Sequence, residues 1–302
     1  MPIYIVEGGI GHALNSTFAL RAASEIGREK AIVLSVWPEV FEHNPDVKIA
    51  YHISKDVDAI SDLYRQYHGR YIIYKDNIYS ERFHLRYPTL HLKHLIAMKW
   101  KLPGILGFKD LYFYPTQTEL ESVKAIYDEA IKPYGESIFG IYQPEGSGIG
   151  GNPAAPLKGI PVSLSEGILD GLPENVFLFH IRLPKENPIK HKKLISIELK
   201  SIRELVIFAR YCSFGIGCES VMNHIMAGLY HKRFITLFGR SNPFTYAHHE
   251  TVILREDSSC PYIGCEMPFY PVERICNRAV CMDAITPSSV LEKLDQVLTE
   301  LG

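Results

Sequence analysis

The sequence has no excess of charge of one sign and no long hydrophobic run. Its 32 Lys and Arg residues nearly balance its 34 Asp and Glu residues, which argues against broad nucleic-acid binding. No stretch reaches the roughly 18 consecutive apolar residues of a membrane span. Residues 1–6 lack the basic start and long apolar run of a signal peptide. We therefore expect a cytoplasmic protein, and its 302 residues are typical of about two domains.

Cysteine is scarce, with six residues in the chain, and four of them fall in one short segment. Disulfides are disfavoured in the expected reducing compartment. The segment contains two pairs with the same C-x4-C spacing, which is wider than the C-x2-C of common zinc sites. Four thiolates could hold a structural zinc or iron ion, and the alternative is four free thiols. The candidate metal ligands are Cys260, Cys265, Cys276 and Cys281.

Near the N-terminus, a glycine-rich turn separates an apolar run from a helical pattern. Residues 3–6 are apolar, Gly8-Gly9-Ile10-Gly11 follows, and apolar residues then recur at helical spacing through Ala23. Glycine lets a backbone approach a ligand closely, and the start of a helix attracts anions. Gly9 and Gly11 are therefore candidates to cradle a phosphate or a carboxylate. A turn needed only for packing explains the pattern equally well.

Short apolar runs at residues 31–36, 72–74 and 138–142 alternate with helical or loop segments. This alternation predicts mostly parallel sheets that bind ligands at the carboxyl ends of their strands. The last run leads into a second glycine-rich loop, residues 143–151, which either orders around a phosphate or serves as a linker. Ser147 lies in this loop. Two strand-to-glycine-loop units predict two Rossmann-like domains that face each other.

Helix signals mark the boundary between the predicted domains. A capping box at Thr116-x-x-Glu119 heads a helical pattern that ends at Pro133-Tyr134-Gly135. We place the boundary there, which gives an N-terminal domain of residues 1–133 and a C-terminal domain of residues 134–302. A further capping box, Ser201-x-x-Glu204, heads a helix in the second domain.

Between Arg82 and Lys101 the sequence contains no Asp or Glu. Such a basic segment could receive an anionic acceptor or rest on an anionic membrane surface. The alternative, which we favour slightly, is a solvated basic helix face whose apolar side packs in the core. Arg82, Arg86 and Lys93 are the candidate acceptor-binding residues.

In the second half, polar residues follow two predicted strands. Residues 214–217 form a short strand, and Glu219 and Ser220 stand at the start of the helix that follows it. Either side chain could cap this helix or bind a sugar hydroxyl. His224 lies four residues beyond Ser220, so both can project from one helix face. The next strand ends at Gly239 in another loop at a carboxyl strand end.

These motifs resemble glycosyltransferase family 9, the heptosyltransferase family. Residues 6–14, V-E-G-G-I-G-H-A-L, are similar to the family's opening glycine loop and helix. Four further matches follow in the family's order: S-I-R-E-L at 201–205, G-C-E-S-V-M-N-H at 217–224, T-L-F-G-R-S-N-P at 236–243, and C-M-D-A-I-T-P at 281–287. The resemblance is close at the C-terminal end and loose in the middle of the chain.

The resemblance implies a GT-B fold, an α/β architecture of two Rossmann-like domains that face each other across a cleft. The first domain would receive the acceptor, the second would bind the nucleotide sugar, and the last helix, residues 288–301, would pack back on the first domain. The implied activity is inverting transfer of heptose or another hexose-like sugar from a donor such as ADP-heptose. The acceptor would be a hydroxyl of a glycan, a lipopolysaccharide-type molecule or a protein, which allows peripheral contact with the inner membrane. No cofactor is implied for catalysis.

One departure from the family bears on catalysis. His12 stands where the family has the Asp that is its presumed base. A neutral imidazole at a helix N-terminus can still accept a proton near neutral pH, so His12 is the predicted catalytic base and Glu7 the nearest alternative. The resemblance implies a donor-binding role for Gly9, Gly11, Ser147, Glu219, Ser220, His224 and Gly239. The family's phosphate-binding lysine has no clear match, and Lys158 is the nearest basic residue.

Two other functions compete with this interpretation. One is a catalytically impaired nucleotide-sugar-binding protein that keeps the cleft and has lost the base. The other is an NAD-dependent dehydrogenase, which is disfavoured because Leu14 replaces the third glycine of the dinucleotide fingerprint. Residues 35–37, Ser-Val-Trp, also lack the acidic residue expected after the second strand.

Overall fold

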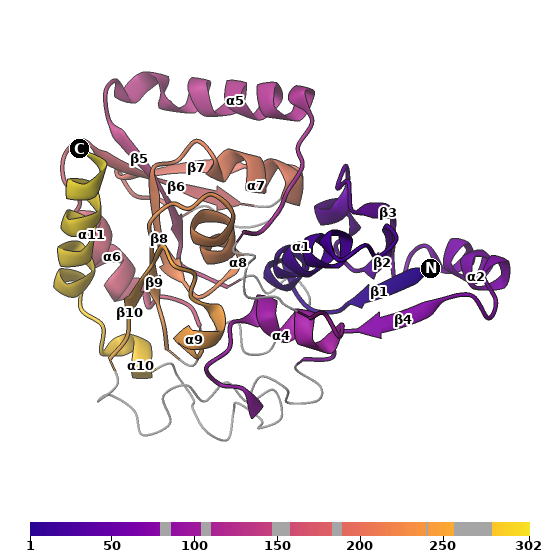
Figure 1. Cartoon of the computed structure of the whole chain (residues 1–302). Helices are drawn as coiled ribbons and strands as arrows, with labels where there is room; N and C mark the ends of the chain where they lie inside the picture. Colours follow the sequence, from indigo (N-terminus) through magenta and orange to yellow (C-terminus); the bar gives the residue numbers. More distant parts are fainter. Residues whose placement is uncertain (79–85, 104–109, 147–157, 183–188, 240, 257–279) are drawn as a thin grey trace. The chain divides into compact units, whose positions relative to one another are not determined.

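The computed structural model describes all of the chain except residues 79–85, 104–109, 147–157, 183–188, 240 and 257–279 (Figure 1). The chain divides into two compact units, Met1–Thr116 and Gln117–Gly302. This division falls before the predicted boundary at Pro133, because the helix α5 (Gln117–Ile131) belongs to the second unit.

The first unit contains a sheet of four parallel strands. The strands are β1 (Pro2–Val6), β2 (Ala31–Ser35), β3 (Val47–His52) and β4 (Ile72–Lys75), and their order across the sheet is β3-β2-β1-β4. Every residue of β1 and β2 is buried, as parallel strands covered by helices on both faces require. In register, Ile3 pairs with Ile32 on one side and with Ile73 on the other.

Helices cover this sheet and bury the apolar side chains of its central strands β1 and β2. The helices are α1 (Ile10–Glu25), the short 3-10 helix η1 (Pro38–Phe41), α2 (Val57–Gln66) and α4 (Leu92–Lys99). Ile60 and Leu63 of α2 share one core cluster with Ile3 and Leu34 of the sheet. The helix α4 packs against α1, and the ring centroids of His94 and Phe18 lie 5.3 Å apart, edge to face.

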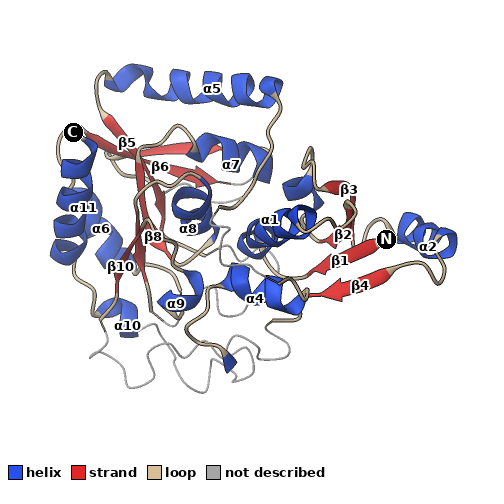
Figure 2. Cartoon of the chain, in the orientation of Figure 1, coloured by secondary structure: helices blue, strands red, loops and turns tan. Residues whose placement is uncertain are grey.

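The second unit contains a sheet of six parallel strands (Figure 2). The strands are β5 (Ile138–Gln143), β6 (Val176–Arg182), β7 (Leu194–Glu198), β8 (Phe214–Cys218), β9 (Phe234–Leu237) and β10 (Thr251–Leu254). Their order is β10-β9-β8-β5-β6-β7. With β5 counted as the first strand, this is the Rossmann order 3-2-1-4-5-6, and the first unit has the beginning of the same order, 3-2-1-4. The prediction of two Rossmann-like α/β units is therefore confirmed.

The helices of the second unit fall into two groups, one for each face of the sheet. The longer helices, besides α5, are α6 (Val162–Asp170), α7 (Ile202–Ala209) and α11 (Pro287–Leu301). Shorter segments are η3 (Lys132–Tyr134), α8 (Val221–Asn223), the π-helix η5 (His224–Leu229), α9 (Pro243–Tyr246) and α10 (Val280–Asp283). The predicted capping box heads α7, since the Ser201 hydroxyl accepts the backbone N–H of Glu204 at 3.1 Å.

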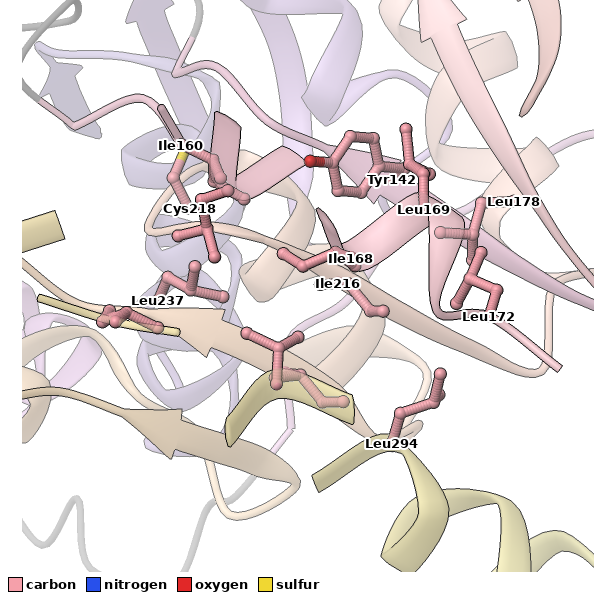
Figure 3. Packing of buried hydrophobic residues seen from close by; sticks show 14 of the residues in the cluster. Tyr142, Ile160, Ile168, Leu169, Leu172, Leu178, Ile216, Cys218, Leu237 and Leu294 are labelled. Atoms are coloured by element: carbon pink, nitrogen blue, oxygen red, sulfur yellow. The ribbon is translucent and has the colours of Figure 1, made fainter. Parts of the chain in front are cut away.

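One face of the second sheet forms a hydrophobic core (Figure 3). Tyr142 and Ile216 contribute from the central strands, Ile168 from α6 and Leu294 from α11. The α11 side chains Val290, Leu294 and Val297 are all buried within this cluster. The apolar face of α11 is thus buried within the second unit, and the packing of this helix on the first domain stays a prediction.

The opposite face of the second sheet carries aromatic side chains under α5 and α7. The ring of Tyr127 on α5 lies 5.6 Å from the rings of Phe179 on β6 and Phe208 on α7. Glu119 at the start of α5 receives two N–H groups of Arg203, one of them at 2.8 Å. These contacts explain why α5 belongs to the second unit. Within the described ranges, none of the helices has the length and apolarity needed to cross a membrane.

Candidate functional site

In each sheet, successive strands are added on one side of the first strand, and the fourth strand then lies on its other side. Polar residues lie at this point of reversal in both sheets. In the first unit the strands are β1 and β4, and in the second they are β5 and β8. Ligands of doubly wound sheets bind at this point, beyond the carboxyl ends of the strands. Glu7 follows β1 and Asp76 follows β4, while Glu219 follows β8. The two clusters are described separately below.

The glycine turn after β1 requires glycine at residue 8. Gly8 has a φ of +109°, and a Cβ there would lie 3.1 Å from the Cβ of His12. Gly9 precedes α1 with a φ of −79°, and a Cβ on it would meet no atom within 4 Å. Gly11 is buried in the first turn of α1. The sequence analysis selected Gly9 and Gly11, but Gly8 is the glycine that the backbone conformation demands.

The predicted base His12 forms a buried hydrogen bond with Asp76. Its Nε2 lies 2.7 Å from Oδ2 of Asp76, and the two side chains are 2% and 1% exposed. The other carboxylate oxygen of Asp76 accepts the backbone N–H of Glu7 at 3.4 Å. Glu7 itself is exposed. Sequence reasoning missed Asp76, and the available signal was its position two residues after the predicted strand 72–74.

Trp37, which follows β2, is attached to the same glycine turn. Its indole Nε1–H donates to the Gly8 carbonyl at 3.2 Å, and its backbone N–H donates to the Ser35 hydroxyl at 3.1 Å. The carboxyl ends of β1, β2 and β4 are thus joined by hydrogen bonds around Gly8 and His12.

In the second unit, a buried ion pair joins Lys158 to Glu219. The Lys158 ammonium and the Ser241 hydroxyl both donate to Oε2 of Glu219, the hydroxyl at 2.8 Å. Burial raises the pKa of Glu219, but the charge and hydrogen bond of Lys158 and the nearby His224 outweigh this effect. The pKa of Glu219 therefore lies below its ordinary value of 4.5. The sequence offered Lys158 only as the basic residue nearest to the family's phosphate-binding lysine. The structure places it in contact with Glu219, a predicted donor-binding residue.

Residues of the helical segment after β8 make further polar contacts. Nδ1 of His224 lies 2.8 Å from Nε2 of His248. The amide of Asn223, which is fully buried, donates to the Tyr246 carbonyl at 2.8 Å and accepts the Thr251 hydroxyl at 2.7 Å. His224 begins a π-helix, an irregularity that is frequent at functional sites.

Of the two remaining candidate donor-binding residues, Ser220 could contact a ligand, whereas Gly239 is required by packing. Ser220 occupies the N-cap position of α8 without a side-chain capping bond, and its buried hydroxyl has no hydrogen-bond partner among the described residues. Such a hydroxyl is available to a ligand. Gly239 is needed for packing, because a Cβ on it would lie 2.8 Å from Sγ of Cys281 and 3.0 Å from Sδ of Met282.

The candidate acceptor residues are only partly described. Arg86 is exposed and Lys93 is half-buried on α4. Burial lowers the pKa of Lys93, whose Nζ lies 5.3 Å from the centroid of the Phe18 ring. Leu95 and Trp100 of this basic stretch are fully buried, so its apolar side packs in the core as the alternative interpretation expected.

Several predicted residues lie outside the described ranges, namely Arg82, Ser147, Cys260, Cys265 and Cys276. Of the four cysteines, the structure describes Cys281, which is buried on α10. Among the described residues there is no group of three or more His, Cys, Asp or Glu that could hold a metal ion. The four-cysteine site stays a prediction, because three of its ligands are not described.

Comparisons with known proteins agree with this architecture. No family model matches the sequence, and no curated protein matches it. A solved glycosyltransferase family 9 structure from Veillonella parvula aligns with a TM-score of 0.68 at 14% identity, covering 99% of this chain and 97% of that one. The E. coli ADP-heptose lipopolysaccharide heptosyltransferase II aligns with a TM-score of 0.66 at 15% identity, covering 99% and 98%.

A third match is the dodecameric, iron-containing heptosyltransferase TibC of enterotoxigenic E. coli. Its structure with ADP-D-β-D-heptose aligns with a TM-score of 0.68 at 12% identity, covering 100% of this chain and 77% of TibC. At sequence identities this low, structural similarity indicates a shared fold and nothing more specific. The predicted GT-B fold is thereby confirmed, and the chain has the fold of the solved family 9 glycosyltransferases.

Proposed function

We propose that the chain is a glycosyltransferase that moves a sugar from a nucleotide-sugar donor to an acceptor hydroxyl. The observation that carries this proposal is the presence of two Rossmann-like units, each with a buried carboxylate bonded to a basic side chain at the point where the strand order reverses. Similar solved structures are named as heptosyltransferases and hold ADP or ADP-heptose. These names support a donor with a nucleoside diphosphate leaving group and a heptose or related hexose-like sugar.

In the proposed complex, the second unit binds the donor. Lys158 balances charge on the diphosphate, which develops further negative charge as it leaves. A diphosphate that attracts Lys158 competes with Glu219 for the ammonium, so the Glu219 carboxylate becomes available to accept a sugar or ribose hydroxyl. Ser220 contributes its buried hydroxyl, which no described residue binds, and His224 lies close enough to influence the charge of Glu219.

In the proposed reaction, His12 takes the proton of the acceptor hydroxyl. The acceptor oxygen forms a bond to the anomeric carbon, the bond from that carbon to the diphosphate oxygen breaks, and the nucleoside diphosphate leaves with the electron pair. Attack from the face opposite the leaving group inverts the anomeric configuration. Arg86 and Lys93 are proposed to attract an anionic glycan, lipopolysaccharide-type or protein acceptor to the first unit.

Thermal unfolding of the full chain tests donor binding. A nucleoside diphosphate at about 100 times its Kd stabilises its protein by about 2.7 kcal/mol, so ADP, UDP and GDP can be ranked by the rise in Tm. We expect one of them to raise the Tm of the wild type, and a Lys158→Met variant to lose most of that rise. An exposed Lys124→Met variant provides the control and should respond as the wild type does.

Turnover then separates the enzyme from a binding protein. Incubation with the sugar nucleotides of the preferred base should release the nucleoside diphosphate, and NMR of the product should show inversion at the anomeric carbon. A rise in Tm without release or transfer from any donor would support the catalytically impaired binding protein. If no nucleotide raises the Tm, the proposed function is wrong.

A further inference from the structure

We propose that Ser241 is a positioning residue for Glu219, and that it holds one carboxylate oxygen so that the other accepts a hydroxyl of the nucleotide-sugar donor. This inference rests on the proposed function and deepens it, because it assigns the donor hydroxyl to one atom, Oε1 of Glu219. The sequence motifs did not select Ser241, which lies two residues after Gly239.

Two neighbouring strands bring the serine and the glutamate together. Glu219 directly follows β8, and Ser241 lies four residues beyond the end of β9. The two strands pair in parallel, with Cys218 opposite Leu237, so both residues leave the sheet at its carboxyl edge. Ser241 is 1% exposed, and the side chain of Glu219 is 7% exposed. Their hydrogen bond is therefore shielded from water, where a bond to a charged acceptor is strong.

Both donors that bind Glu219 use the same oxygen atom. The Ser241 hydroxyl donates to Oε2 at 2.8 Å, and the Lys158 ammonium donates to that atom as well. An ionised carboxylate has about four acceptor positions, two on each oxygen. None of the residues that the structure describes donates to Oε1. One side of the carboxylate is thus occupied, while the lone pairs of Oε1 can accept another donor.

Oε1 of Glu219 also keeps some contact with solvent. The fully buried polar atoms that lack a partner include the hydroxyl of the next residue, Ser220, but not this oxygen. A fully buried and unpaired carboxylate oxygen would carry a large desolvation cost. A hydroxyl that replaces water at Oε1 gives the carboxylate a hydrogen bond in place of the one it loses.

The neighbouring charges explain what the serine adds. Besides Ser241, the groups that act on the charge of Glu219 are Lys158, which precedes α6, and His224 at the start of η5. In the proposed complex the diphosphate attracts Lys158, whose ammonium moves on a flexible stem of four carbons. Ser241 is neutral and its side chain is short. It can therefore keep Oε2 in place, and Oε1 toward the ligand, while the lysine turns to the diphosphate.

A carboxylate oxygen selects a particular ligand chemistry. It accepts hydrogen bonds and donates none, so it repels phosphate oxygens and favours a hydroxyl. A donor analogue without the matching hydroxyl leaves the oxygen unpaired, which is why such sites discriminate strongly. The hydroxyl can belong to the ribose or to the transferred sugar. A nucleoside diphosphate offers the ribose hydroxyls alone, so its affinity distinguishes the two sources.

The test is a Ser241→Ala variant of the full chain. We expect its Kd for the nucleotide sugar to rise about 10–100-fold, as the loss of a hydrogen bond to a charged group predicts. Ser241→Thr keeps the hydroxyl and should bind nearly as the wild type does. A rise for the nucleotide sugar alone assigns the bound hydroxyl to the transferred sugar. An equal rise for the nucleoside diphosphate assigns it to the ribose.

Ser137→Ala is the matched control. The Ser137 hydroxyl donates to the Tyr134 carbonyl at 2.7 Å, and this serine precedes β5 at the amino edge of the same sheet. The control variant should bind the donor as the wild type does. A wild-type Kd in Ser241→Ala, or an equal loss of affinity in Ser137→Ala, would overturn the inference.

A second measurement tests the contact without a donor. In protein labelled with ¹³C at the glutamate carboxyl groups, the Glu219 signal is assigned by its loss in a Glu219→Gln variant. The Ser241 hydroxyl favours the charged carboxylate, so Ser241→Ala should raise the pKa of Glu219 and Ser241→Thr should restore it. An unchanged pKa in Ser241→Ala would contradict the positioning role. If no nucleotide binds the wild type, the proposed function fails, while this titration still decides whether Ser241 holds the carboxylate.

Discussion

At the scale of single residues, the buried charges are the features with the largest energetic consequences. The side chains of Lys158 and Glu219 are 17% and 7% exposed, whereas those of Lys124 and Asp128 on α5 are 48% and 51% exposed. A partner lost from a buried pair leaves an uncompensated charge in a medium of low dielectric. An exposed pair exchanges one partner for water at little cost.

We predict that Lys158→Met lowers the free energy of unfolding by about 3–5 kcal/mol near pH 8. The loss should be smaller at pH 5. In the wild type, the lowered pKa of Glu219 means that its stabilising contribution is present above the ordinary value of 4.5 and disappears as the pH falls through the folded-state pKa. In the variant, burial without Lys158 raises that pKa, so acid neutralises the unpaired carboxylate. Chemical denaturation at both pH values measures the difference.

The control for this prediction is Lys124→Met, which removes an exposed pair spaced four residues apart on α5. It should cost about 0.3–0.5 kcal/mol at either pH. An equal loss at pH 5 and pH 8 for Lys158→Met would mean that the charge of Glu219 is not what destabilises the variant.

At the scale of elements, the central strands of the second sheet depend on glycine. A Cβ on Gly217 of β8 would lie 2.6 Å from the Gln143 carbonyl of β5, and one on Gly215 would lie 2.5 Å from the Phe234 ring. Glycine weakens a strand in isolation, and it is retained where another backbone approaches closely. The close approach occurs beside Glu219, so these glycines also shape the approach to the candidate donor site.

We predict that Gly217→Ala destabilises the protein by at least about 2 kcal/mol, since a backbone carbonyl of a neighbouring central strand cannot move aside. Gly9→Ala should change stability by less than about 1 kcal/mol, because a Cβ there meets no atom within 4 Å and the φ of −79° suits any residue. Urea denaturation of both variants provides the comparison. Similar losses in the two would show that glycine flexibility, not strand contact, determines the effect.

At the scale of the whole molecule, each unit has a hydrophobic core of its own. Ile32 belongs to the cluster between the first sheet and α2, and Ile216 belongs to the cluster that includes α6 and α11. Multi-domain chains often depart from two-state unfolding for this reason. Stability in this protein is therefore better described for each unit than by one value.

We predict that calorimetry of the full chain resolves two transitions. Ile32→Ala should lower one of them and Ile216→Ala the other, each by the several degrees that a loss of about 2–5 kcal/mol produces. The nucleoside diphosphate that binds should raise only the transition lowered by Ile216→Ala. If both variants shift one common transition equally, the two units unfold together.

Local sequence patterns determined the type and position of many elements. The predicted strands at residues 3–6, 31–36, 138–142 and 214–217 correspond to β1, β2, β5 and β8. The Ser201 capping box heads α7 as expected. Periodicity, glycine and capping residues act over a few neighbouring residues, so a single sequence is enough to interpret them.

The tertiary structure decided which distant residues meet. The Asp76–His12 pair depends on β4 lying beside β1, and the Lys158–Glu219 pair depends on β8 lying beside β5. Likewise, the position of α5 follows from its aromatic and ionic contacts with α7 and the second sheet. Strand order and helix packing arise from long-range burial, which a local pattern does not encode. The sequence by itself therefore determined the elements and nominated His12 and Glu219, and only tertiary packing supplied the charged partner of each.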